Sequence, residues 1–301
     1  MVTPKPHDSP RPKFKRLPPR KCMTIAIGLL ATDGVILAAD SQETLGSFKS
    51  DESKFLIANQ GLKTEKAGAI AITGAGDSGY LDSINQELCT AFLSKKKWTP
   101  LALLGKTRTI VKTFHHDHVV PYGKFPEHDR PEMRLIIGSH INGRGILWST
   151  EKSTVSGGKR YFAVGIGYPY ARVMLRRFWT PMDTVKAASL AAYILFQVKN
   201  TADGCGKETQ IVIIKDGHAA YLSQDNINLL EYAFEERART ENLFLHFSLG
   251  LDLPEDDIKT TLARFSFLLD KSRKDVIDCQ RFKMSSYHAG KRPLDEPEMM
   301  R

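Results

Sequence analysis

Cysteine is scarce in this chain, and its spacing does not suit a metal. The cysteines are Cys22, Cys89, Cys205 and Cys279, and no C-x-x-C pair occurs among them. This distribution argues against a disulfide framework and against a zinc site. The sequence also lacks any apolar run near the roughly 18 residues that a membrane span needs. We therefore expect a cytoplasmic protein that holds no metal or cofactor and does not enter a membrane.

The excess of basic charge is confined largely to one end of the chain. The formal net charge is +9, and residues 1–23, with seven Lys or Arg and one Asp, contribute +6 of it and leave +3 for the remainder. The remainder has no basic stripe interleaved with aromatic residues, the pattern typical of nucleic-acid binding. We expect no nucleic-acid partner.

Residues 1–23, called the leader below, show no sequence pattern that predicts a helix or a strand. The leader contains six prolines and shows no apolar periodicity. It also lacks the apolar core of about 7–15 residues that marks a secretory signal peptide. We therefore treat the leader as separate from the body of the protein, which begins near residue 24.

The segment from residue 24 to residue 46 is the most informative in the chain; it reads TIAIGLLATDGVILAADSQETLG. Two apolar runs flank the turn signal Thr32-Asp33-Gly34, which predicts a β-hairpin. Strands that are apolar at nearly every position are covered on both faces. Asp40 ends the second run at the rim of a core, where an unpaired charge is costly, so it needs a cationic partner. The next lysines along the chain are Lys49 and Lys54.

This hairpin resembles the amino-terminal hairpin of catalytic proteasome β-type subunits and of the bacterial peptidase HslV, which are N-terminal-nucleophile (Ntn) hydrolases. In that family the mature chain begins at a threonine sixteen residues before the aspartate, and here these positions are Thr24 and Asp40. The family's catalytic lysine corresponds to Lys54, at the start of the run KFLIA, after a loop two residues shorter than usual. Lys49 is the alternative.

The chemistry that the resemblance implies requires Thr24 to be the first residue. A threonine hydroxyl is a poor nucleophile unless a base is close by. A free α-amine, with a pKa of about 7.7–8, suits that role near neutral pH. A lysine favours the alkoxide, and an aspartate keeps the lysine charged. Either Met23 is the true initiator and is removed, or the leader is a propeptide; the alternative is that the leader is retained and Thr24 is an ordinary strand residue.

Other positions are assigned by the same resemblance. Thr44 falls in the segment that holds the substrate backbone. The glycine loop around Gly74 and Gly76 forms part of the substrate cleft, and the Gly74 N–H corresponds to an oxyanion donor. Cys205 and Asp203 stand at or near the places of a serine and an aspartate that support the amino terminus.

Two further motifs could indicate nucleotide or metal binding, but each has a structural explanation. Residues 74–79 fit G-x-G-x-x-G, but a dinucleotide site needs a βαβ unit, and here one predicted helix is followed by another. The histidines at 115–118 and 128 are best read as a solvated turn at a helix end, where histidines are favourable.

The order of the predicted elements indicates an α+β fold, a four-layer αββα Ntn-hydrolase sandwich with a C-terminal helical extension. We divide the chain into the leader 1–23, a hydrolase domain at 24–223, and a helical extension with a flexible tail at 224–301. Predicted helices cover 79–94, 100–115, 170–178, 183–199, 228–239 and 254–269, and predicted hairpins cover 134–151 and 210–222.

Three functions are compatible with these observations. The first is a threonine-type peptidase subunit acting on peptides or unfolded proteins within a homo-oligomeric ring, with an ATPase as a partner that the resemblance suggests. The second is a catalytically inactive structural subunit of the same fold. The third is an Ntn amidohydrolase acting on a small amide, because a fold does not fix its substrate.

Overall fold

A computed structural model describes residues 24–45, 48–61, 68–95, 97–125 and 131–248, together with the helical positions 259–260, 262–263, 266–267, 270–271 and 274. The predicted leader, the chain after residue 274 and most of the predicted helix at 254–269 lie outside the described residues. The proposed leader and the proposed flexible tail are therefore not described by the structure.

The strands of the described part form three antiparallel sheets. The first sheet has the spatial order β10 (Tyr161–Gly165), β1 (Ile25–Leu30), β2 (Val35–Asp40), β11 (Thr209–Lys215) and β12 (His218–Tyr221). The second sheet has the order β5 (Leu56–Gln60), β6 (Gly68–Gly76), β7 (Met133–Ile141), β8 (Arg144–Glu151) and β9 (Thr154–Gly157). A two-stranded sheet consists of β3 (Gln42–Leu45) and β4 (Phe48–Asp51).

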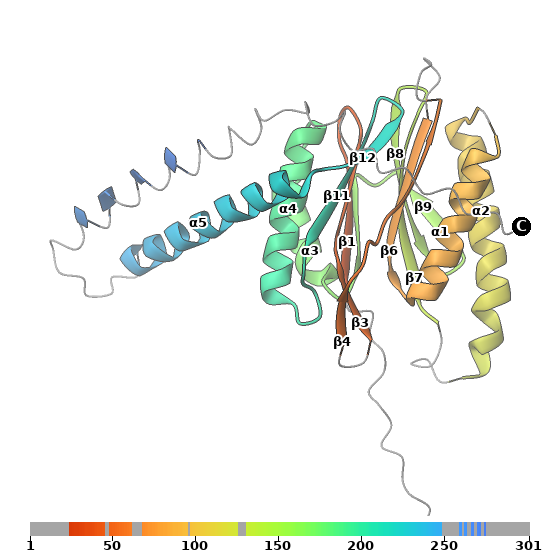
Figure 1. Ribbon diagram of the computed structural model, residues 1–301, viewed down its shortest axis with the longest axis horizontal. Coiled ribbons are helices and arrows are strands. Elements are labelled where there is room, and N and C mark those ends of the chain that lie inside the picture. Colours follow the sequence, from red (N-terminus) through yellow and green to blue (C-terminus); the bar gives the residue numbers. More distant parts are fainter. Residues whose placement is uncertain are drawn as a thin grey trace, which may run out of the picture.

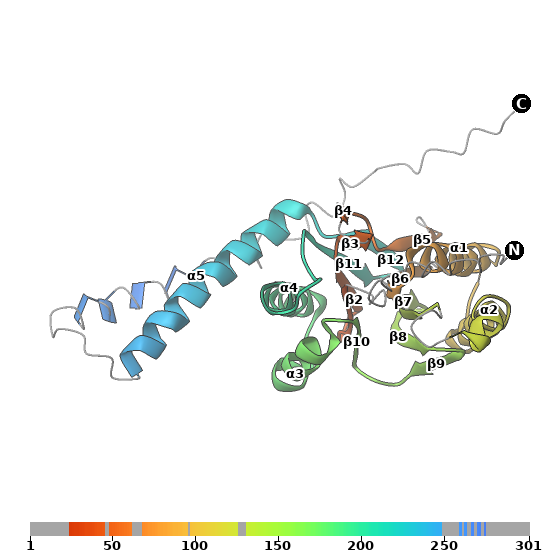
Figure 2. The ribbon, with the colours of Figure 1, turned by 90° about the horizontal axis from the view of Figure 1, so that it is seen from below.

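Four helices of the described part follow one another in two pairs along the chain, and a further helix comes after the last strand. They are α1 (Ser78–Leu93), α2 (Pro100–His118), α3 (Tyr168–Phe178), α4 (Thr184–Thr201) and α5 (Gln224–Ser248), with a short 3₁₀ turn η1 (Val120–Lys124). Helices α3 and α4 pack on the first sheet, and α1 and α2 pack on the second (Figure 1). The two sheets face each other across a shared apolar layer (Figure 2). The predicted α+β class is confirmed as a mixed α/β fold.

Strand β1 is apolar at every position because both of its faces are buried. Ile25, Ile27 and Leu29 contact the α3–α4 side, whereas Ala26 contacts the second sheet. Gly28 also lies at the contact between the sheets, and a Cβ added there would come within 2.6 Å of an Ile136 methyl carbon. Small residues on one face let the sheets approach, and large ones on the other fill the space under the helices. Burying one such isoleucine or leucine side chain contributes about 1.5–3 kcal/mol to the free energy of folding, relative to leaving it exposed.

Local sequence signals define several element ends. Thr99 Oγ1 accepts a hydrogen bond from the Ala102 N–H at 3.2 Å and caps α2. Asp183 caps α4, because its Oδ1 accepts from the Lys186 N–H at 2.9 Å. Asn142 has a φ of 53°, the left-handed conformation expected in the β7–β8 hairpin turn.

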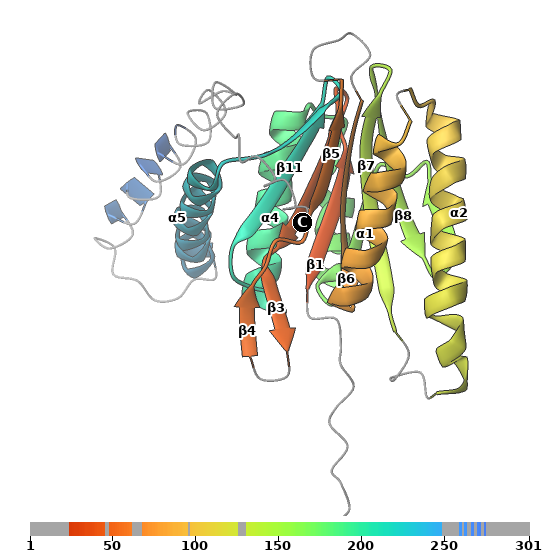
Figure 3. The ribbon, with the colours of Figure 1, turned by 45° about the vertical axis from the view of Figure 1, so that its right-hand side comes forward.

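Some elements were not predicted. The strands β3 and β4 and the edge strand β9 are short and carry no alternation of apolar and polar residues, so only their pairing defines them. Figure 3 shows β3 and β4 projecting past the end of the first sheet. The fifth helix is also longer than the predicted 228–239. Its first turns pack on α4 through Ile227, Leu230 and Phe234, and it then extends away from the sheets (Figure 1). Among the described residues, no helix combines the length and apolarity required to cross a membrane.

Candidate active site

Thr24 lies at the start of β1, directly beside the end of β2. The register of the hairpin, in which Ala26 pairs with Ala39, places Ile25 beside Asp40. The Ile25 N–H accordingly donates to Asp40 Oδ1 at 3.1 Å. Thr24 itself is only 6% exposed. The two ends of the predicted hairpin are therefore brought together by strand pairing alone.

The structure brings Thr24, Asp40 and Lys54 into direct contact. The Thr24 hydroxyl donates to Asp40 Oδ1 at 2.5 Å. Lys54 Nζ donates to Thr24 Oγ1, to Asp40 Oδ1 at 2.7 Å and to the carbonyl oxygen of Gln42 at 2.6 Å. Lys54, one of the two candidate lysines, thus contacts Asp40.

Asp40 is fully buried, and its charge is matched by donors on both oxygens. Oδ1 accepts from Thr24, Ile25 and Lys54, and Oδ2 accepts from the Gly206 N–H at 2.9 Å. A buried carboxylate is tolerated when it is paired with a cation and its remaining lone pairs are hydrogen-bonded. The site therefore stabilises Asp40 as an anion.

The environment of the Lys54 ammonium group lowers its pKa. Burial lowers the pKa of Lys54, and the opposing negative charge of Asp40, with smaller contributions from Cys205 and Glu43, offsets part of that effect. In its protonated form Lys54 places a positive charge beside the Thr24 hydroxyl oxygen, and such a charge favours the alkoxide form of a hydroxyl.

The backbone places Thr44 on β3 and Lys49 on β4, and their side chains lie outside the described part of the structure. They are paired across the β3–β4 ladder. The predicted role of Thr44 in holding substrate backbone stays a prediction.

Gly74 and Gly76 lie on β6, which ends next to the start of β1. They pair with Leu135 and Met133 of β7, and an added Cβ would come within 2.5 Å and 2.2 Å of backbone carbonyl oxygens at the two positions. Between them, Ala75 faces Gly165, whose own added Cβ would lie 3.3 Å from Ala75 Cβ and 2.2 Å from the Thr24 carbonyl oxygen. The end of β6 is thus near Thr24, and the oxyanion role of Gly74 stays a prediction.

The loop between α4 and β11 supplies one residue that the sequence reasoning did not identify. Gly206 donates its N–H to Asp40, and a Cβ at this position would collide with Gln42 Oε1 at 2.5 Å. Cys205, which was predicted to support the amino terminus, is buried, and burial raises the pKa of its thiol to about 12. Asp203 is exposed to solvent. The signal available in the sequence was only the pair of glycines, Gly204 and Gly206, around the cysteine.

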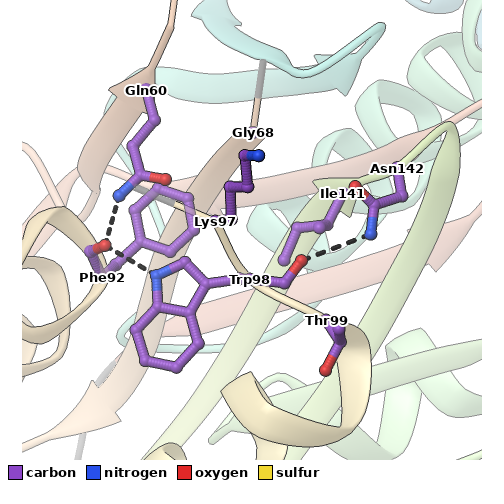
Figure 4. Close-up of a pocket in the computed structure, with 8 residues that line it drawn as sticks. All are labelled: Gln60, Gly68, Phe92, Lys97, Trp98, Thr99, Ile141 and Asn142. Atoms are coloured by element: carbon purple, nitrogen blue, oxygen red, sulfur yellow. Dashed lines mark hydrogen bonds between the residues drawn. The ribbon is translucent and has the colours of Figure 1, made fainter. Parts of the chain in front are cut away.

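Within the described ranges, no three His, Cys, Asp or Glu residues are grouped so that they could hold a metal ion. A cavity of about 230 Å³ lies elsewhere, at the connection between α1 and α2 (Figure 4). Its polar groups are used within the protein: Trp98 Nε1 donates to the Phe92 carbonyl oxygen at 2.8 Å, and Asn142 Nδ2 donates to the Trp98 carbonyl oxygen at 3.3 Å. This cavity is part of the packing of that connection.

Comparisons with known proteins find solved structures that have a similar fold, but no related sequence. No protein-family model and no curated protein matches the chain. Solved structures with a similar fold include Anbu (ancestral beta-subunit) from Yersinia bercovieri, at 14% identity and a TM-score of 0.59, covering 77% of this chain and 100% of that one. A Gly-1 mutant of Anbu from Hyphomicrobium sp. strain MC1 gives 16% identity, a TM-score of 0.57, and coverage of 77% and 99%. The Anbu complex from Pseudomonas aeruginosa, described as a helical assembly, gives 14% identity, a TM-score of 0.57, and coverage of 77% and 99%.

The family assignment drawn from the sequence is wrong. The 24–46 hairpin resembles proteasome β-type subunits and HslV, but no family model matches, and the similar structures named above are Anbu proteins. A hairpin with a charged end is a local arrangement, and it does not distinguish one family with this kind of fold from another. What the likeness establishes is the fold.

Proposed function

We propose that the chain, once it begins at Thr24, is an N-terminal-nucleophile hydrolase that cleaves amide bonds in peptides or unfolded proteins. The observation that carries the proposal is the position of the Thr24 hydroxyl between Lys54 Nζ and the buried Asp40 carboxylate. The two facing sheets with a helix pair on each outer face agree with the αββα Ntn sandwich expected from the sequence.

The reaction that these groups would perform needs no added reagent. In the full chain the Thr24 nitrogen belongs to a peptide bond and cannot act as a base. With the leader absent it is an α-amine that takes the hydroxyl proton while Oγ1 attacks the substrate carbonyl carbon. The protonated amine then delivers its proton to the departing amine as the C–N bond breaks, which leaves an ester on Oγ1. Water hydrolyses this ester: the α-amine takes a proton from the water, the water oxygen attacks the acyl carbon, and the C–Oγ1 bond breaks as the proton returns to Oγ1.

Lys54 and Asp40 would act on the same oxygen without transferring a proton. The lysine charge stabilises the negative charge that develops on Oγ1, an electrostatic effect that is strong in a site shielded from water. Asp40 keeps that lysine charged and in place. A backbone N–H at the end of β6, with Gly74 as the candidate, would receive the oxyanion of the substrate.

The proposal includes self-association of the chain. The Pseudomonas aeruginosa Anbu complex is described as a helical assembly, and this chain shares its fold. An assembly would restrict access to the site and so favour peptides or unfolded segments over folded proteins. An ATPase that supplies such segments is part of the same proposal.

The test is hydrolysis by protein that starts at Thr24. A chain produced with a removable methionine before Thr24 should release the fluorophore from short peptide amides, whereas Thr24→Ala should not and Thr24→Ser should retain part of the activity. Intact mass must show the expected first residue in each sample. Full activity in protein that still carries residues 1–23 would exclude the proposed base. Absence of activity toward peptides together with cleavage of small amides would instead support the amidohydrolase alternative, and absence of both would support an inactive structural subunit.

A further inference from the structure

The long C-terminal helix α5 makes a polar contact beside the candidate active site. Glu231 Oε1 accepts hydrogen bonds from Lys199 Nζ of α4 and from Thr209 Oγ1 of β11, each at 2.6 Å. The Lys199 and Glu231 side chains are only 11% and 22% exposed, and Thr209 is fully buried. Figure 2 shows the first turns of α5 close to α4 and β11. The contact is therefore a shielded, charge-assisted one, stronger than a surface ion pair.

Lys199 connects this contact to the loop at residues 202–208. Its Nζ also donates to the carbonyl oxygen of Lys207 at 3.2 Å. Lys207 has a φ of 61°, a left-handed conformation that is uncommon for a residue other than glycine. A backbone conformation of this kind persists when surrounding contacts hold it. The Glu231–Lys199 pair is one such contact.

The opposite side of the same loop holds Asp40 and its neighbour. The Gly206 N–H donates to Asp40 Oδ2 at 2.9 Å. Glu208 and Ser41 exchange two hydrogen bonds, from the Glu208 N–H to Ser41 Oγ and from the Ser41 N–H to the Glu208 carbonyl oxygen, both at 2.9 Å. The loop thus lies between Glu231 of α5 and the carboxylate that holds Lys54.

We propose that Glu231 is a positioning residue for the active site: it holds the 202–208 loop so that the Gly206 N–H reaches Asp40. This inference rests on the proposed function and gives the start of the C-terminal extension a role in it. Glu231 touches none of the reacting groups. Its loss would loosen the loop, weaken one of the hydrogen bonds to the buried Asp40 carboxylate and so displace Lys54 from Thr24.

The kinetic test compares two glutamates on the same helix. Glu231→Ala is expected to lower kcat by about ten- to a hundredfold, the usual effect of a small misplacement of catalytic groups, with little change in KM. Glu231→Gln keeps an acceptor oxygen for Thr209 and Lys199 and should recover part of the loss. The control is Glu241, an exposed residue paired with Arg237 one turn away. Glu241→Ala and Glu241→Gln should leave both constants unchanged.

A second readout is independent of catalysis. Amide hydrogen exchange, measured on the Thr24-initiated protein with its C-terminal extension intact, should become faster at Gly206 in Glu231→Ala than in Glu241→Ala, while exchange in the β6–β7 ladder stays equal in the two variants. If wild-type protein shows no hydrolysis but Gly206 exchange responds to Glu231, the proposed function fails and the positioning contact stands. If wild-type protein is active and neither kcat nor Gly206 exchange separates the two alanine variants, the inference is overturned.

A double variant tests the route through Lys199. Lys199→Met removes the donor to the Lys207 carbonyl oxygen, so it should lower kcat as Glu231→Ala does. Residues that act through one contact are not additive. Lys199→Met combined with Glu231→Ala should therefore lower kcat no further than the more damaging single change. Additive losses would show that the two residues act separately and would contradict the proposed route.

Discussion

A carboxylate without solvent access is stable as an anion only where donors surround it, and this condition shapes the candidate site. Asp40 meets it with two backbone N–H groups, a hydroxyl and a lysine ammonium. Lys54 in turn directs its donors to Asp40, Thr24 and the Gln42 carbonyl oxygen. The two charges depend on each other, so each should be costly to remove alone.

Removing Lys54 alone should therefore affect both activity and stability. Lys54→Met should abolish turnover and lower the free energy of unfolding by about 3 kcal/mol, because it leaves a buried charge without its counter-ion. Adding Asp40→Asn should recover most of that stability without restoring activity. Chemical denaturation and peptide hydrolysis measure the two effects. Lys49→Met is the control and should retain activity; a stable Lys54→Met, or an inactive Lys49→Met, would contradict the assignment.

Two glycines with positive φ allow a matched test of the space around Thr24. Gly165 has a φ of 98°, and an added Cβ would lie 2.2 Å from the Thr24 carbonyl oxygen; Gly143 has a φ of 72° and open space around it. Both alanine variants should lose about 1–3 kcal/mol of stability from backbone strain. Gly165→Ala should in addition displace Thr24 and lower kcat at least about tenfold, since small misplacements in an active site are costly. Equal kcat values in the two variants would show that Gly165 does not position the nucleophile.

At the scale of elements, most of the fold was accessible from the sequence because its signals are local. The hairpin turn at Thr32–Gly34, the threonine cap of α2 and the Asn142 turn each depend on a few adjacent residues. The strands β3, β4 and β9 were missed, because pairing rather than composition defines them. The strand order, which places β11 beside β2 and brings Gly206 to Asp40, depends on contacts between distant segments and could not be derived from periodicity.

The candidate site likewise combines residues that local sequence signals identify with residues that only the packing of distant segments brings together. Thr24, Asp40 and Lys54 were found because they belong to one continuous hairpin and the segment after it, where a resemblance can be recognised. Gly206 and Glu231 are more than 160 residues from Asp40 along the chain, and their types are unremarkable in sequence. Their relation to the site follows only from the packing of α4, β11 and α5.

The β1–β2 turn is joined to α4 and β11 by a carboxylate, which gives a pH-dependent contribution to stability. Asp33 accepts from the Thr184 N–H at 2.8 Å and from Lys215 Nζ at 2.7 Å. Burial alone would raise the pKa of Asp33, but hydrogen bonds from Lys215 and Thr184 and the lysine charge outweigh it and hold the pKa below 3.8. The carboxylate therefore stabilises the fold above that pH, and the contribution is lost as the pH falls through the lowered value.

Asp33→Asn should consequently lower the free energy of unfolding by about 1–2 kcal/mol at neutral pH, less than the roughly 1.5–3 kcal/mol usual for a hydrogen bond to a charged group, because the side chain is partly exposed to solvent. The difference from wild type should shrink in strongly acidic solution, where the wild-type carboxylate is itself protonated. Urea denaturation as a function of pH measures both regimes. Asp82→Asn, on the exposed face of α1, is the control. A difference that does not depend on pH would mean that the Asp33 charge is not what joins these elements.

At the scale of the whole molecule, the exposed apolar residues bear on self-association. Self-association through α1 and α2 would require apolar outer faces on these helices, but their exposed residues are mainly polar. Leu93 and Leu101 are their large exposed apolar residues, at 54% and 78%, and Val173 on α3 is 67% exposed. Large exposed apolar residues thus lie on both helix pairs, and they are positions at which the proposed self-association can be tested.

Light scattering after size exclusion should show an assembly of several copies for the wild-type chain. Leu101→Asp and Val173→Asp should each reduce the mass of the particle, because a charge at a desolvated contact opposes association. Lys106→Ser, on the exposed side of α2, should leave the mass unchanged. A wild-type monomer that hydrolyses peptides would exclude assembly as a condition for activity.

The most direct measurement is the site at which an amide-mimicking electrophile reacts with the active protein. A peptide β-lactone would acylate the activated hydroxyl, and digestion followed by mass spectrometry locates the added mass. The proposed mechanism predicts a single adduct on Thr24 as the first residue, absent from Thr24→Ala and strongly reduced in Lys54→Met. An adduct on Cys205 or Cys89, or none on protein shown by mass to begin at Thr24, would contradict it.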